Sequence, residues 1–257
     1  MASTTVTISQ SAFPRFYVWM AIACVVIAFG GFAPTYWLQL PAGTFVGSRL
    51  LHLHGALFFA WTILLLVQTV LVASGRLPNH RAMGLAGIAL ASAMVFTGIA
   101  AAIGTLTLGL SEGYGDRSRA FMIIPVTAIG LFAGFFAAAI ANIQRPEWHK
   151  RLMILATVSL LQAAMGRVFF VLITGGGPGL RPGLGAPPPL SIGLVPSLIV
   201  ELLIVAGMAY DWKTRGRPHP AWLIGVAVIT AVILIRGPIA GTSAWLATAD
   251  FLSSFVH

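Results

Sequence analysis

Two histidines occupy matching places in two similar stretches of the sequence. Residues 76–81 (RLPNHR) and 145–150 (RPEWHK) share the pattern R-x-x-x-H-[R/K], each with a proline, and each opens a long apolar run. A neutral imidazole is a good axial ligand for haem iron, and two imidazoles from facing helices can hold one b-type haem. We therefore consider His80 and His149 as ligands of a haem iron. Basic side chains that could pair with haem propionates follow them: Arg81, Lys150 and Arg151.

The repeated pattern also indicates an internal duplication. The apolar runs on either side of each copy would form a helical hairpin, and the two hairpins would have the same orientation. This arrangement places His80 and His149 in the same leaflet, and repeats in membrane bundles often have a site at their interface. The alternative is that both are interfacial histidines in basic loops, which only assist topology and helix entry.

A second set of ionisable residues falls inside or at the ends of apolar runs: His54, Arg167, Glu201 and Arg236. Charge is costly in a bilayer, so each member is a functional candidate. Arg167 lies about five turns after His149 on the same helix face, near the opposite end of the span. We expect Glu201 to pair with Arg167 or Arg236. The remaining positive charge could hold a quinone-like or anionic ligand, or the pair could serve only to fix helix register.

Other metal chemistry has weaker support. His52 and His54 form His-x-His-Gly, but residues two apart on a helix diverge, and no third ligand is evident. The single cysteine, Cys24, lies in an apolar run, where we expect a buried small side chain.

The elements that must position these residues are transmembrane helices. Hydrophobic residues make up 58% of the 257 residues and charged residues only 8%, whereas soluble domains have about 25% charged residues. We expect an all-α integral membrane bundle, a single domain covering 1–257. Seven segments are long enough to span: 16–40, 50–74, 80–110, 120–144, 149–174, 190–210 and 220–245.

The loops predict the orientation. Nine arginines and lysines fall in the N-terminus and the second, fourth and sixth connections, against four on the other side. Positive charge favours the cytoplasm, so we expect a multi-pass protein of a bacterial-type inner membrane, with a cytoplasmic N-terminus and a periplasmic C-terminus. The net charge of +9 then reflects topology and not nucleic-acid binding. The Gly/Pro-rich stretch 175–189 is expected to be a periplasmic loop, and residues 1–14 do not resemble a cleaved signal peptide.

Several segments resemble a family of uncharacterised polytopic membrane proteins of alphaproteobacterial type: FGGFAPTYWLQLPAGTF, HLHGALFFAWT, RPEWHKRLM and DWKTRGRPHP. This resemblance implies architecture and no particular activity.

The segment from His80 to Gly84 (H-x-x-x-G) resembles a haem-ligand segment of cytochrome b561-like proteins, in which four consecutive helices hold haem between paired histidines. The resemblance would cover residues 50–174. It implies a second pair at the opposite leaflet, where His52 and His54 are available but the repeat-equivalent positions are Phe121 and Ile123. Only Met122 lies nearby as a possible ligand. At most one haem therefore has its usual ligands.

Other functional classes lack their signatures. No Walker-type loop is present, and no lysine lies within a late span, as a retinal Schiff base requires. The first hypothesis is a redox protein with haem b and a quinone-like or anionic ligand. The alternatives are an accessory subunit of a larger membrane complex, and a small-molecule or proton transporter in which Glu201 titrates.

Overall fold

The computed structural model describes residues 15–175 and 186–256. Its helices are α1 (Phe16–Phe32), α2 (Arg49–Ala73), α3 (Leu77–Ser111), α4 (Gly115–Phe121), α5 (Ile123–Ala141), α6 (Pro146–Thr174), α7 (Leu194–Arg215), α8 (Pro220–Ala240) and α9 (Ser243–Ser253). Short helical turns cover Ala33–Trp37, Leu190–Gly193 and Ser254–Val256. Predictions made for 1–14 and for most of the Gly/Pro-rich loop, including Arg181, one of the four basic residues counted on the second side, fall outside the described residues.

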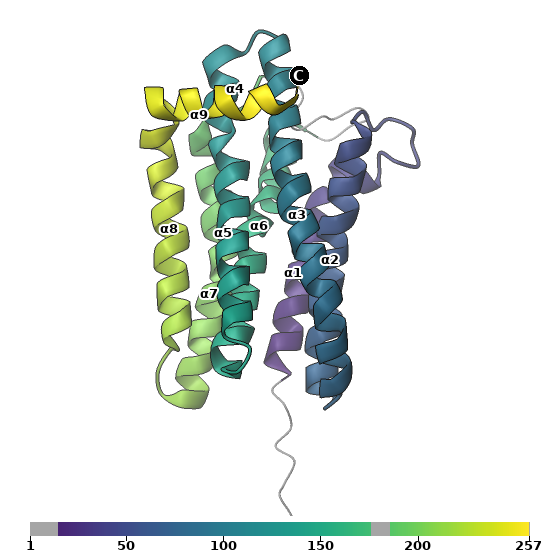
Figure 1. Cartoon of the computed structure of the whole chain (residues 1–257), viewed down its shortest axis with the longest axis vertical. Coiled ribbons are helices and arrows are strands. Elements are labelled where there is room, and N and C mark those ends of the chain that lie inside the picture. The colour runs from purple at the N-terminus through teal and green to yellow at the C-terminus, as the bar shows by residue number, and fades with distance from the viewer. Residues whose placement is uncertain (1–14, 176–185, 257) are drawn as a thin grey trace, which may run out of the picture.

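Seven helical stretches in the described ranges are long and apolar enough to cross a membrane, with α4 and α5 forming one of them. The prediction of an all-α membrane bundle with about seven spans is confirmed. The long helices run side by side, and their outward faces carry exposed large apolar side chains that suit lipid (Figure 1).

The predicted last span was too long at its C-terminal end. Helix α8 stops at Ala240, and α9 then lies across the end of the bundle (Figure 1). The Thr242 side chain caps α9 by accepting from the Trp245 amide at 3.3 Å. Trp245 Nε1 donates to the Arg119 carbonyl at 2.8 Å, and Arg119 pairs with Asp250 at 2.6 Å. These contacts hold α9 against α4, so Trp245 belongs to a surface helix and not to a span.

The two hairpins expected from the repeat are present, since α2 packs along α3 and α5 packs along α6. The repeated histidines have equivalent backbone positions: the His80 amide donates to the Arg76 carbonyl at 3.1 Å, and the His149 amide to the Arg145 carbonyl at 3.0 Å. Trp61 of α2 joins the hairpins, because its Nε1 donates to Thr157 of α6 at 3.0 Å. Helix α1 covers one side of this core against α6 and α2.

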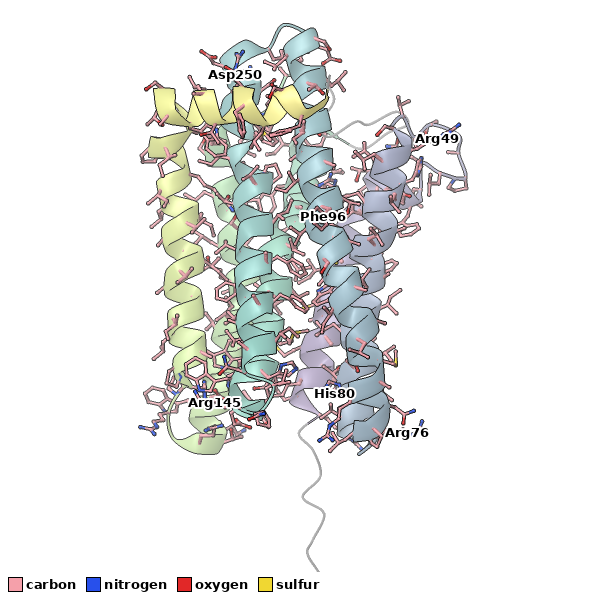
Figure 2. All side chains as sticks on the ribbon, in the orientation of Figure 1. Arg49, Arg76, His80, Phe96, Arg145 and Asp250 are labelled. Carbon is pink, nitrogen blue, oxygen red and sulfur yellow. The ribbon has the colours of Figure 1, made fainter. Side chains whose placement is uncertain are left out.

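Charged residues mark both ends of the bundle. Arg76, His80 and Arg145 mark one end, called here the histidine end, whereas Arg49 and Asp250 mark the other, called the α9 end (Figure 2). The division of basic loops between two sides therefore agrees with the prediction for the residues that the structure describes.

Candidate functional site

The histidine end brings the two repeated histidines together. The ring centres of His80 and His149 are 6.4 Å apart, and the ring planes are at 82° to each other. Each ring comes from the first turn of its helix, α3 or α6, which the shared backbone pattern places at the same depth. Two imidazoles on opposite sides of one metal ion have ring centres about 6 Å apart, since each metal–nitrogen bond is about 2 Å.

Nδ1 of each ring already lies within hydrogen-bond distance of another group of the protein. His80 Nδ1 lies 2.9 Å from Gln68 Oε1, and Gln68 Nε2 donates back to the His80 carbonyl at 3.2 Å. His149 Nδ1 lies 2.9 Å from the Ala139 carbonyl oxygen. A carbonyl oxygen can only accept, so His149 Nδ1 donates, and the same tautomer suits His80 against the Gln68 amide oxygen. This tautomer leaves the lone pair on Nε2 of both rings.

Both Nε2 atoms are available. Neither forms a hydrogen bond with any residue in 15–175 or 186–256, and both histidines are only half-buried. Metal-binding histidines typically donate their other nitrogen to a carbonyl or carboxylate, as these rings do at Nδ1. The donor set and the ring spacing fit a metal held between two imidazoles.

The three basic residues expected beside the histidines behave differently. Arg81 is exposed and forms no ion pair with a described residue. Lys150 pairs with Glu147 at 2.6 Å and lies 4.8 Å from the centre of the Tyr17 ring. Arg151 is buried with Asp211. Of the three, Arg81 is the side chain open to an anionic group at the protein surface.

Sequence reasoning missed a buried ion-pair cluster beside this site. Arg151 forms a bidentate pair with Asp211, with Nε to Oδ2 at 2.8 Å and a second contact through Nη2. Arg151 also reaches Glu147 at 2.8 Å, and Glu147 accepts a further contact from Arg215. The cluster joins α6 to α7. From the sequence, Arg151 was considered as a possible propionate partner, and neither Glu147 nor Asp211 was singled out. The acid near the end of α7 is a signal that could have revealed the cluster.

His219 connects this cluster to α8. Its amide donates to Asp211 Oδ2 at 3.1 Å, and its Nδ1 caps α8 by accepting from the Ala221 amide at 3.1 Å. Burial, with the nearby positive charges of Arg151 and Arg215, lowers the pKa of His219 below its usual value. A neutral ring is the form that can act as this acceptor.

The residues expected to cluster toward the α9 end separate into distinct places, and the expected ion pair of Glu201 is wrong. Glu201 is buried and accepts from Thr230 of α8 at 2.7 Å, and it pairs with no arginine of the described chain. Arg236 lies about 9 Å further along α8 than Thr230. This axial offset keeps the two charges apart.

Arg236 and Arg167 instead contact neutral groups. Arg236 Nε donates to Thr127 Oγ1 and its Nη1 to Gln162 Oε1, both at 2.7 Å. The Arg167 guanidinium lies 4.1 Å from the centre of the Phe32 ring and donates to the Ala163 carbonyl of its own helix at 3.0 Å.

The α9 end shows no metal centre in its described part. His54 packs against Phe58 with ring centres 4.0 Å apart and planes tilted by 35°, and it interacts electrostatically with Arg167. His52 instead contacts the Tyr36 hydroxyl at 3.0 Å, so the two histidines diverge as expected. No group of three or more histidine, cysteine or acidic residues that could hold a metal ion occurs in the described ranges.

Comparison with protein-family models, with curated proteins and with solved structures returns no match.

Proposed function

We propose that this membrane protein binds one b-type haem between His80 and His149 and acts in electron transfer. The observation that carries the proposal is the approach of the two rings to 6.4 Å, with Nδ1 of each engaged and Nε2 of each available. A haem held in this way supplies one-electron chemistry. Gln68 and the Ala139 carbonyl would fix the orientation of the two rings, and Arg81 would be the partner of a propionate.

The proposal is tested by a dithionite-reduced minus air-oxidised optical spectrum of the full chain, expressed in haem-replete cells and purified in mild detergent. Sharp low-spin b-type bands are expected. His80→Ala and His149→Ala should each abolish them, whereas the matched control His52→Ala at the opposite end should retain them. A colourless wild-type protein that is folded and helical would refute the proposal.

A quinone is the lipid-soluble class of redox partner that we propose, with Arg167 and His54 at its site. The Arg167 guanidinium lies over the Phe32 ring and the His54 ring packs at a tilt against Phe58, so two N–H-bearing groups lie beside aromatic rings. A short-chain quinone analogue should raise the thermal midpoint of the wild type. Arg167→Gln should remove this rise without removing the haem bands. An analogue that stabilises both proteins equally would show that Arg167 is not part of the quinone site.

We place the histidine end in the cytoplasm of a bacterial-type cell, because the basic residues are concentrated there. Electron transfer is favoured over the accessory and transport alternatives by the paired, oriented imidazoles, which neither alternative requires.

A further inference from the structure

Arg236 is a buried cation without a charged partner. Arg236 is only 5% exposed and lies about one turn before the end of α8. Thr127 and Gln162 accept from Nε and Nη1, but both acceptors are neutral. No carboxylate among the described residues forms an ion pair with it. A guanidinium is always protonated, so the full positive charge stays within the bundle.

The third nitrogen of the same guanidinium has no partner among the described residues. Arg236 Nη2 is buried and makes no hydrogen bond with the described part of the chain. A buried charged donor left unpaired costs more than a neutral one, so such a group is expected to have a partner that the protein chain does not supply.

A small cavity lies against Arg236, lined by residues of α5, α6, α7 and α8. Its volume of about 10 Å³ is room for a single water-sized species. Gln162 and Ser197 line one side, and Ser197 Oγ donates to the same Gln162 Oε1 that accepts from Arg236, at 3.0 Å. Leu131, Val158, Val200, Ile229 and Ile233 form most of the remaining wall.

We infer that this cavity is a binding site for one halide ion, which is chloride under cellular conditions. The charge calls for a monovalent anion, and the unpaired Nη2 supplies the N–H donors for it. A cavity of this size favours a monatomic anion over a carboxylate headgroup, a phosphate or a quinone ring. A water molecule would satisfy the donor but not the charge. The site is independent of the proposed haem, which lies at the opposite end of the bundle.

The test is the thermal midpoint of the full chain in detergent, measured in sodium chloride, bromide, gluconate and sulfate at one ionic strength. Chloride and bromide should raise the midpoint by a few °C, saturably, as expected for a ligand of the native state. Gluconate should not, and sulfate should give only the non-saturable rise of a salt excluded from the protein surface. Radioactive chloride should bind at about one ion per chain.

Two variants locate the effect. Arg236→Gln should abolish both the halide-dependent rise and chloride binding. If Arg236→Gln does not fold, Val200→Ile provides the second test, because an added methylene fills the cavity and leaves the arginine in place. The control Arg119→Gln removes a guanidinium that pairs with Asp250, and it should retain the full halide response.

Three results would overturn the inference. They are equal midpoints in chloride and gluconate, a halide response that persists in Arg236→Gln, and a halide response that persists in Val200→Ile.

Discussion

Arg151 of α6 and Asp211 of α7 face each other as a bidentate ion pair in which the side chains are 1% and 0% exposed. Removal of one partner of such a pair leaves the other charge buried and uncompensated. Because the His219 amide and Glu147 complete the same cluster, α6, α7 and the start of α8 depend on this contact.

Asp211→Asn should therefore lower the free energy of unfolding by about 3–5 kcal/mol. The measurement is denaturation in mixed micelles, followed by tryptophan fluorescence. Asp250→Asn is the matched control, since its pair with Arg119 is half-exposed and should contribute at most about 1 kcal/mol. Equal losses in the two variants would contradict a special role for the buried pair.

Gln68→Leu should weaken haem binding by about 10–100-fold, because it removes the acceptor that orients the His80 ring. Transfer of haem to apomyoglobin measures the release rate, and the midpoint potential reports the change in ligand basicity. The control Gln144→Leu, in the exposed turn before α6, should leave the release rate and the midpoint potential unchanged. Identical release from Gln68→Leu and wild type would show that Gln68 does not support a ligand.

Stability should fall on acidification below about pH 6.5 because of His219. The pKa of its folded form is lowered by burial, so the unfolded chain, with a pKa near 6.5, binds the proton more readily. The stabilisation is complete above pH 6.5 and is lost as the pH falls toward the folded pKa. Protonation of Nδ1 also removes the cap of α8, at a cost of about 1 kcal/mol. Thermal midpoints from pH 8 to 5 measure this.

His219→Asn supplies the matched comparison, because asparagine can cap a helix at every pH in this range. The variant should show a flatter pH profile than the wild type. A parallel profile would assign the pH dependence to other groups.

Single cysteines should report opposite sides of the membrane in intact cells. Cys24 is fully buried and should not react with a membrane-impermeant maleimide, so the wild type is the unlabelled control. Glu112→Cys, between α3 and α4, should be labelled from outside. Gln144→Cys, between α5 and α6, should be labelled only after permeabilisation. The reverse pattern would invert the proposed orientation.

Periodicity and composition predicted the spans well because lipid demands long apolar helices, whatever their neighbours. The R-x-x-x-H repeat placed His80 and His149 at one end, since identical helix starts give identical depths. The sequence could not reveal which helix faces lie next to one another, and this is why the Glu201 pairing failed and Asp211 was missed. The depth of a residue in the membrane can be counted along its helix from the sequence. The neighbouring helix that its side chain faces depends on packing, as around Arg151, Gln162 and Thr127.

The two proposed haem ligands are oriented by different kinds of partner. His80 depends on the side chain of Gln68, whereas His149 depends on the main-chain carbonyl of Ala139. Substitution at position 68 can alter or remove the first partner, but no substitution at position 139 deletes a carbonyl. Natural variation can therefore adjust the two sides of the site unequally: the His80 side is open to evolutionary tuning, and the His149 side is fixed by the path of the backbone.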